Sequence, residues 1–375
     1  MKRRSIFQFV ITSFLVAVLT ASCGLFGNSG TDVPNPKNTS IQNKTFKIAG
    51  ILPLTGPAAD SAEYIKKGMD LAAEEINAKE PGSIDLIYEN SKNEVKLGVS
   101  AFQKLAITQK PNAIVISRSS ITKAVAPLTK DSKTVLIATS VAIPKVTDSS
   151  EYVFRVYPEA NGLAGVAAKY AIKQCKSATV IYVNDDFGLS SAEVFQKTFE
   201  KEGQKVVSKE PYNPTEKDFR TQLEKIKSLD PSCIWLVGYG PAYSTIIKQI
   251  RELNIPSEVI ADQTLGLPIT VQQTGSAAEG IVYVDAPIGK EFAETYQKRY
   301  GNLPTSYAGY SYDIVKMLDK VRKEKGVSNE DIRIGLSSIK DFSGAMGKIS
   351  ILPNRDASIE FVLMQIKNGK PTIYK

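Results

Sequence analysis

Short, mostly apolar runs alternate with helix-like segments along the chain from Phe46 onwards. Four runs of strand length come first, and they read FKIAGIL, IDLIYEN, NAIVI and TVLIATS. The segments between them repeat apolar residues at helical spacing, as Ile65, Met69, Ala72 and Ile76 do after the first run. Runs of this length predict β-strands, and the helical spacing predicts amphipathic α-helices between them.

The same alternation restarts near Asn161. Five further strand-like runs, separated by helical segments, read ATVIYV, KVVSKEP, CIWLVGY, VIAD and GIVYVDA. After Ala286 the pattern changes to three helices, predicted around Glu291–Tyr300, Ser306–Lys325 and Asn329–Ile339. Two short strand-like runs, KISIL and EFVLMQI, complete the pattern.

This order predicts an α/β protein with two Rossmann-like lobes. Strands that alternate with helices form mostly parallel sheets with helices on both faces, joined by right-handed crossovers. We expect an N-terminal lobe of residues 46–157 plus 287–354 and a C-terminal lobe of residues 158–286 plus 355–375. The late helices then complete the first lobe and the last strands complete the second. Because the chain crosses between the lobes several times, the crossings form a multi-strand hinge between two rigid bodies.

Polar and aromatic residues follow the predicted strands directly. Ligands of open parallel sheets bind outside the carboxyl ends of the strands. The candidate lining of a binding site is therefore Leu54–Ser61, Ser117–Thr122, Thr139–Ala142, Asp185–Phe187, Tyr239, and Asp262 with Gln263. None of these loops carries a glycine-rich phosphate-binding motif, which disfavours a nucleotide as the ligand.

Two helix starts carry candidate polar contacts. Asp60 and Glu63, three residues apart, predict a capping box at the first helix. Ser119 and Ser120 stand at the start of the helix after NAIVI, where free backbone N–H groups and the helix dipole favour an anion such as a carboxylate. The alternative is that one of these serines simply caps the helix.

The composition excludes several kinds of chemistry. The 375 residues include no histidine, so a Ser-His-Asp or Cys-His catalytic arrangement is impossible. The three cysteines have no zinc-binding spacing, and we expect neither a metal nor a cofactor. The net charge of +8 arises from basic residues spread along the chain, without the dense basic face of a nucleic-acid binder. We therefore expect a protein that is not an enzyme and does not bind nucleic acid.

Residues 1–22 have the pattern of an export signal. Three basic residues precede an apolar stretch from Ile6 to Leu19, which is shorter than a membrane span requires. The following LTASC resembles a bacterial lipoprotein box, in which the cysteine, here Cys23, carries the lipid. Residues 23–45 are polar and rich in Gly, Pro, Ser and Asn, and they predict a flexible tether. We expect a protein anchored through Cys23 in the periplasm or on the outer face of the cell membrane; an ordinary secretory signal is the alternative.

The other two cysteines each precede a strand-like run. Cys175 comes just before ATVIYV, and Cys233 comes just before IWLVGY. If these two strands are neighbours, the sulfurs meet at the strand starts and form a disulfide in the oxidising space outside the cytoplasm. The alternative is a pair of buried free thiols, and both interpretations stay open on the sequence alone.

A series of motifs resembles one protein family. They read GILPLTGPAAD, KKGMDLAAEEINA, SRSSITKAVAP, IATSVAIP, YVFRVYP, VIYVNDDFG, EKDFRTQLEKIK, TGSAAEGIV, YSYDIVKML and FSGAMGKISILPNRDA. In this order and spacing they are similar to the type I periplasmic substrate-binding proteins of ABC importers, in the branched-chain amino acid (Leu/Ile/Val) binding family. The resemblance covers almost all of Phe46 to Lys375 and implies two lobes that close over a small ligand.

The resemblance also implies roles for individual residues. In the first lobe, Ser119 would bind the ligand α-carboxylate through its hydroxyl. Ser140 would add backbone contacts, with Ala142 beside it. From the second lobe, Phe187 and Tyr239 would wall the ligand in.

The remaining implied contacts concern the ammonium group and the rim of the cleft. Asp262 would pair with the α-ammonium, and Gln263 is the alternative if the loop lengths differ by one residue. Tyr312 would reach the cleft from the late helix. Such an arrangement keeps both charges of a zwitterion paired after they leave water.

Three positions depart from the family pattern. Ala142 stands where the amino-acid binders usually have threonine, and Ser61 replaces an aromatic residue near the first loop. Arg118 is also unusual at its position, where it either adds to the anion site or points into solvent. An amino acid stays the expected ligand, with urea, amides and aromatic acids as alternatives.

Together these features predict a solute-binding protein that delivers an amino acid or a similar small zwitterion to an ABC importer. The expected partners are the ligand, the permease subunits and, through the lipid anchor, the membrane, and we expect a monomer. A ligand-sensing receptor subunit that reports to a signalling partner is the alternative, since the same lobes would serve it.

Overall fold

The first sheet contains five parallel strands in the order β2-β1-β3-β4-β5. The computed structural model describes residues 45–375, and the predicted export signal and Cys23 lie outside them. The strands are β1 (Phe46–Leu52), β2 (Ile84–Asn90), β3 (Ala113–Ile116), β4 (Leu136–Ala138) and β5 (Val153–Arg155). Strands β3, β4 and β5 are buried throughout, as expected for parallel strands covered on both faces.

The second sheet has the order β14-β13-β10-β9-β8-β6-β7. Its strands β6 to β10 pair in parallel, and β13 and β14 join antiparallel at the β10 edge. The bounds are β6 (Ser177–Val183), β7 (Lys205–Tyr212), β8 (Cys233–Val237), β9 (Glu258–Ala261), β10 (Val282–Asp285), β13 (Val362–Lys367) and β14 (Lys370–Ile373). We refer to each sheet with the helices packed on it as the first and the second lobe.

The helices follow the predicted alternation. Around the first sheet they are α1 (Ala59–Lys79), α2 (Val95–Lys104), α3 (Ser119–Val125), α4 (Thr129–Ser132), α10 (Lys290–Tyr300), α11 (Ser306–Glu324) and α12 (Asn329–Ser337). Around the second they are α5 (Ala160–Gln174), α6 (Asp186–Lys201), α7 (Arg220–Leu229), α8 (Pro241–Glu252) and α9 (Pro268–Thr274). None of the helices in residues 45–375 combines the length and apolarity that a membrane crossing needs.

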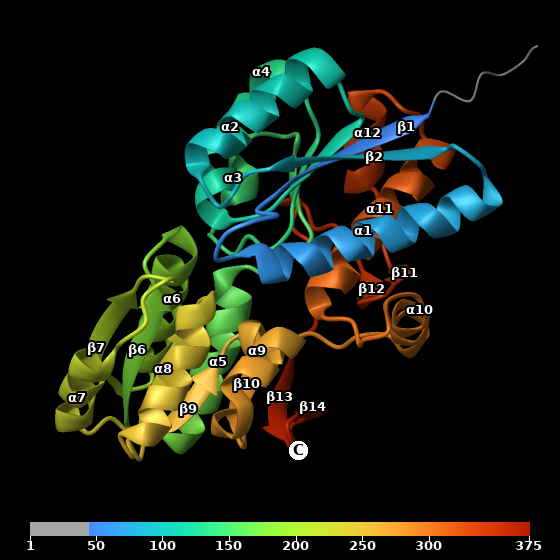
Figure 1. Ribbon diagram of the computed structural model, residues 1–375. Helices are drawn as coiled ribbons and strands as arrows, with labels where there is room; N and C mark the ends of the chain where they lie inside the picture. The colour runs from blue at the N-terminus through green and yellow to red at the C-terminus, as the bar shows by residue number, and fades with distance from the viewer. Residues whose placement is uncertain (1–44) are drawn as a thin grey trace, which may run out of the picture. The chain divides into compact units, whose positions relative to one another are not determined.

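Helices α1 and α11 pack side by side (Figure 1). Helix α1 buries the apolar stripe that its sequence spacing predicted, including Ile65, Met69, Ala72 and Ile76. A Cβ atom on Gly68 would lie 2.1 Å from the carbonyl oxygen of Ala308, so glycine is what allows the two backbones to approach. Residues far apart in the sequence thereby build one lobe.

The chain passes between the sheets after β5, after β10, and again before β13. The late helices α11 and α12 pack with the first lobe and β13 joins the second sheet, as predicted from the sequence, and β14 pairs with β13. The described residues 45–375 form one compact unit, and the residue bounds given above for each lobe stay a prediction.

A buried ion pair fixes the last crossing to the first sheet. Arg155 in β5 is fully buried, and its Nε and Nη2 donate to Oδ1 and Oδ2 of Asp356 at 2.9 and 2.8 Å. Its Nη1 donates to the carbonyl oxygen of Ile143 at 2.7 Å. Every edge of this guanidinium therefore has an acceptor, which offsets the cost of removing the charge from water.

Some local predictions were wrong. Helix α1 has Ala58 at its N-cap without a side-chain hydrogen bond, so Asp60 and Glu63 do not form the predicted capping box. A capping box does occur at α12, between Ser328 and Asp331. The strands β5, β11 (Phe342–Gly344) and β14 were not predicted, because they are short or polar.

The structure joins Cys175 and Cys233 in a disulfide, with Cα atoms 5.9 Å apart. Cys175 follows α5 and Cys233 begins β8, and the start of β6 pairs with the start of β8. The two cysteines therefore meet at adjacent strand starts, which is the arrangement that would allow the bond.

Replacing both cysteines by alanine should lower the free energy of unfolding by about 3 kcal/mol, because the disulfide closes a long loop in the unfolded chain. The residues are 58 positions apart in sequence. Urea unfolding of the wild type and of the double variant C175A/C233A, both without reductant, measures the difference. Equal unfolding midpoints for the two proteins would contradict the assignment, and adding reductant should affect only the wild type.

Candidate functional site

A small cavity lies at the carboxyl ends of strands from both sheets. Its volume is about 10 Å³, room for roughly one water molecule. The lining follows β1, β8 and β9 in the chain and includes one residue of α11. Its members are Pro57, Ala58, Asp60, Ser61, Tyr239, Gly240, Thr264, Leu267, Thr270, Gln273 and Tyr307. This is the edge at which open parallel sheets bind ligands.

The predicted anion site on the first lobe is built from the loops after β3 and β4. Ser119 is buried, and its Oγ accepts a hydrogen bond from the backbone N–H of Ala142 at 3.3 Å. Ser140 is buried nearby in the chain with a left-handed φ of 53°. The structure thus brings Ser119 and Ala142 together through a hydrogen bond within the protein.

The start of α3 differs from the expectation of a serine cap. The N-cap residue is Arg118, with a φ of 80° and no side-chain hydrogen bond to the helix. Ser120 Oγ instead accepts the backbone N–H of Asp186 from the second lobe at 3.4 Å. The prediction that Ser119 or Ser120 caps the helix was therefore wrong.

Tyr239 contacts residues of both lobes. Its hydroxyl donates to Oδ2 of Asp185 at 2.7 Å and accepts a hydrogen bond from Nδ2 of Asn93 at 3.0 Å. The guanidinium carbon of Arg118 lies 3.8 Å from the centre of the Tyr239 ring. Since Asn93 and Arg118 belong to the first lobe, Tyr239 contacts both lobes with its hydroxyl and its ring.

The first turn of α6 supports this contact. Asp185 is the N-cap, and its Oδ1 accepts the backbone N–H of Gly188 at 2.9 Å. Asp186 pairs with Lys123 of the first lobe, with 2.7 Å between Oδ1 and Nζ. Phe187, predicted to wall in the ligand, is buried in this same turn.

Asp262 is wholly buried, and its carboxylate is hydrogen-bonded by groups of the protein. Its carboxylate accepts hydrogen bonds from the backbone N–H of Gly238 at 3.4 Å and from the N–H and hydroxyl of Thr264, both at 3.3 Å. It caps the short 3-10 helix Gln263–Gly266. Burial raises the pKa of Asp262 to about 7, against the opposing hydrogen bonds from Gly238 and Thr264.

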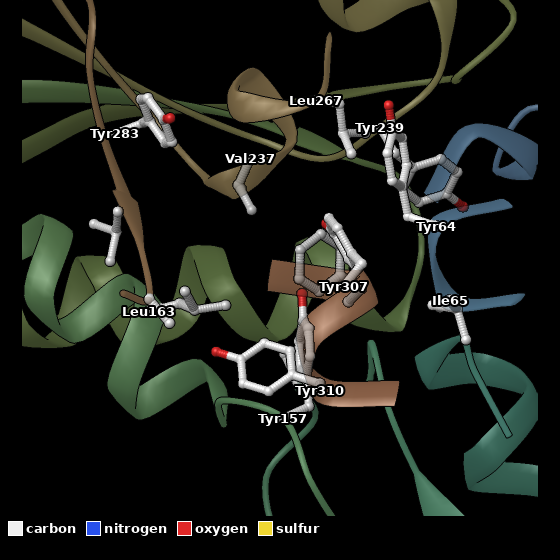
Figure 2. Close-up of a cluster of buried hydrophobic side chains, with 14 of the residues drawn as sticks. Tyr64, Ile65, Tyr157, Leu163, Val237, Tyr239, Leu267, Tyr283, Tyr307 and Tyr310 are labelled. Atoms are coloured by element: carbon white, nitrogen blue, oxygen red, sulfur yellow. The ribbon is translucent and has the colours of Figure 1, made fainter. Parts of the chain in front are cut away.

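Gln263 points into a cluster of tyrosines. Its Nε2 donates to the hydroxyl of Tyr157. The Tyr157 ring lies 6.1 Å from that of Tyr307 and 5.5 Å from that of Tyr310, and Figure 2 shows the three rings gathered where α11 begins. Of the two alternatives for the ammonium contact, Gln263 is thus the side chain that contacts the cluster adjoining the cavity.

Tyr312 does not lie with the other predicted residues. Its hydroxyl donates to Oε2 of Glu75 at 2.6 Å, and its ring packs 4.9 Å from that of Phe292. It lines a separate pocket of about 490 Å³ on the first lobe. Residues of a helix that are three or four apart share a face, so Tyr307 and Tyr310 lie on one face of α11. Tyr312, two residues beyond Tyr310, lies on a different face. The helical spacing within SYAGYSYDIV was the signal that could have identified Tyr307.

Ser119 and Asp262 were predicted to bind the two charged groups of one ligand. The cavity lining includes neither Ser119 nor Asp262, so the structure does not show these two facing one common cavity. Arg118, which was expected either to join the anion site or to point into solvent, is only 6% exposed. It is the buried cation of this junction.

Comparisons with known proteins agree on the fold. The model of a family described as periplasmic binding protein matches residues 45–371. The Leu/Ile/Val-binding protein BraC3 of Rhizobium johnstonii is 26% identical over 347 residues, 88% of this chain and 94% of its own length.

Solved structures give the same picture. The leucine-binding protein LivK of Thermotoga maritima superposes with a TM-score of 0.82 at 25% identity, covering 88% of this chain and 98% of LivK. A solute-binding protein of an ABC transporter from R. palustris, in complex with benzoate, has a TM-score of 0.82 at 19% identity and covers 88% and 95%. The α/β fold with two parallel-rich sheets is that of type I periplasmic binding proteins.

Replacing Asp262 by asparagine should change how stability depends on pH. An unfolded aspartate has a pKa of about 3.9, so between about pH 4 and pH 7 the folded protein holds a proton that the unfolded chain has lost. The contribution of Asp262 to stability is therefore greatest below about pH 4 and falls as the pH rises through about 7. Asparagine, which is neutral, should not show this fall.

Urea unfolding of the wild type and of D262N at several pH values between 4 and 8 measures the effect. The stability of D262N relative to the wild type should increase with pH, by up to roughly 4 kcal/mol over the range. A difference that stays constant across the range would show that Asp262 is ionised in the folded protein throughout.

Proposed function

Because the chain belongs to the periplasmic binding protein family, we propose that it captures a small organic solute between its two lobes and delivers it to an ABC importer. Proteins of this family bind solutes outside the cytoplasm and are not enzymes. Ligand binding would shift an equilibrium between open and closed arrangements of the lobes, and the closed form would dock on the permease. The contacts of Tyr239 with both lobes are the observation that carries this proposal, because they join the sheets at the ligand-binding edge.

The proposed ligand is a small carboxylic acid, with an amino acid as the first candidate. BraC3 and LivK, named for leucine or for the branched-chain amino acids, support this choice. The hydroxyl of Ser119 and the backbone of Ala142 form the part of the site that would receive a carboxylate after the lobes open and rearrange.

An acid without an ammonium group, such as an aromatic acid, is the second candidate. Gln263 presents a neutral amide to the tyrosine cluster, whereas the carboxylate of Asp262 is held by Gly238 and Thr264. An ammonium group pairs best with a free carboxylate in a buried site, and the amide offers only a hydrogen bond. The benzoate bound by the structural relative from R. palustris agrees with this alternative.

We also propose that the mature protein is held at the membrane through a lipid on Cys23. This residue lies outside the described residues, and the support is the lipoprotein-like LTASC at the end of the apolar stretch.

A thermal-unfolding screen tests the receptor proposal. The compounds are leucine, isoleucine, valine, benzoate, 4-hydroxybenzoate, urea and acetamide. A compound at about 100 times its dissociation constant should stabilise the protein by about 2.7 kcal/mol, because it binds the folded state only. We expect at least one carboxylate to do so, and a screen without any stabilising compound would contradict the proposed ligand classes.

The variant Y239A tests the position of the site. Removing this ring should weaken the binding of the compound found in the screen about tenfold or more, a loss of at least about 1.4 kcal/mol. The matched control is Y312F, which removes a hydroxyl bonded to Glu75 in the separate pocket and should leave affinity unchanged. Titration calorimetry measures both, and a stronger loss in Y312F than in Y239A would place the site elsewhere.

Replacing Cys23 by serine tests the anchor. Cells grown with labelled palmitate should incorporate the label into the wild type and not into C23S. The variant should also leave the membrane fraction, since a serine hydroxyl does not accept the thioether-linked lipid. Equal labelling of both proteins would rule out Cys23 as the attachment site.

A further inference from the structure

The side chain of Arg118 is a buried cation at the junction of the lobes. It follows β3, begins α3, and is only 6% exposed. Its neighbours Tyr239 and Tyr307 both line the cavity between the lobes. Burial lowers the pKa of Arg118, but Tyr239, Asp185 and Tyr307 more than offset this effect, so the group stays charged. A charge removed from water requires an acceptor for its N–H groups.

The protein supplies few hydrogen-bond acceptors to the guanidinium of Arg118. The closest acid is Asp185, whose Oδ2 lies 3.7 Å from Nη2, beyond hydrogen-bonding distance. That oxygen already accepts the hydroxyl of Tyr239, and the other oxygen accepts the N–H of Gly188. Within residues 45–375, neither Nε nor Nη2 of Arg118 has a hydrogen-bond partner.

The two unpartnered atoms form one edge of the guanidinium. Nε–H and Nη2–H point in parallel and match the two oxygens of a carboxylate, which is the bidentate geometry that arginine favours. The same protein shows this pairing elsewhere, because Arg155 holds Asp356 through its own Nε and Nη2. Arg118 presents the same edge without a carboxylate from the protein.

Two buried hydroxyls at the same edge of the first sheet also lack hydrogen-bond partners among the described residues. Ser117 and Thr139 stand at the carboxyl ends of the neighbouring strands β3 and β4, and both are fully buried. Among the described residues, neither Ser117 Oγ nor Thr139 Oγ1 has a hydrogen-bond partner. Buried polar groups normally have partners, so this edge of the first sheet has several unused donors together.

We propose that Arg118 binds the carboxylate of the ligand through Nε and Nη2, and that negative charge on the ligand is what the site selects. This inference rests on the proposed function, and it names the residue that determines the substrate class. Urea and neutral amides would then be excluded, because they leave the buried guanidinium without a counter-charge. The competing interpretation is that Arg118 only stabilises the closed arrangement of the lobes, through its contacts with Tyr239 and Asp185, and does not bind the ligand.

Matched acids and amides separate these interpretations. The probes are benzoate with benzamide, and 4-methylpentanoate with 4-methylpentanamide and leucine. Titration calorimetry measures the affinity of each probe for the wild type, R118Q and R118K. The wild type should bind the acid of at least one pair about 100-fold more tightly than its amide, because the amide carries no charge.

The variants should then affect the acids selectively. R118Q should weaken binding of the acid about 100-fold and change binding of the amide by less than about threefold. R118K keeps the positive charge but cannot form the bidentate pair of hydrogen bonds, so its affinity for the acid should fall by an intermediate factor, about tenfold. If R118Q proves unstable to urea, R118K alone still tests the geometry.

Three results would overturn the assignment of Arg118. They are equal affinity of the wild type for acid and amide, an equal loss for both probes in R118Q, and binding of urea or amides without any carboxylate. Each of them leaves the receptor function intact. A wild type that binds neither these probes nor the compounds of the thermal screen would instead contradict the receptor function together with this inference.

Discussion

The contact between the Arg118 guanidinium and the Tyr239 ring, 3.8 Å apart, is the interaction on which the arrangement of the site depends. It joins the loop after β3 in one sheet to the loop after β8 in the other. The hydrogen bonds of Tyr239 to Asp185 and Asn93 lie around it. A stacked cation and ring attract each other more strongly once water is excluded, so the contact gains strength as the lobes approach. It also removes the guanidinium from water without satisfying its N–H groups.

The protein treats its other buried charges differently. Arg155 has an acceptor at every edge, and it holds the last chain crossing to β5. Asp313 accepts two backbone N–H groups, from Ala345 and Met346, and burial raises its pKa to about 7. These groups are structural, since the protein provides their partners. Arg118 is the buried group at the junction for which the protein provides a ring and a distant acid, which is why we assign its partner to the ligand.

Much of the fold could be predicted from the sequence because the signal is periodic. The apolar spacing of Ile65, Met69, Ala72 and Ile76 determines which face of α1 is buried, and α1 matches the prediction. The antiparallel strand β14, which reads KPTI, could not be found in this way because an exposed edge strand needs no apolar run. The start of α1 was also misjudged, since its N-cap is Ala58 and no side chain caps it.

The site was harder to predict because it depends on single residues and on which face of α11 is turned toward the cavity. Ser119 and Ala142 lie together and Tyr239 lies at the junction, whereas Tyr312 is on another face of α11. Asp262 and Gln263 are adjacent in the sequence, but Asp262 caps a turn whereas Gln263 reaches Tyr157. An error of one residue in a loop length therefore exchanges their roles. The burial of Arg118 follows from its left-handed backbone and from Tyr239 in the other lobe, and neither feature is visible in the spacing of SRSSIT.

The most direct test of this account is a crystal structure of the protein with its tightest-binding carboxylate. The account predicts both carboxylate oxygens at about 3 Å from Nε and Nη2 of Arg118, with the ligand enclosed between Tyr239 and Tyr307. A ligand bound between the lobes whose carboxylate leaves Nε and Nη2 of Arg118 unpaired would contradict the account.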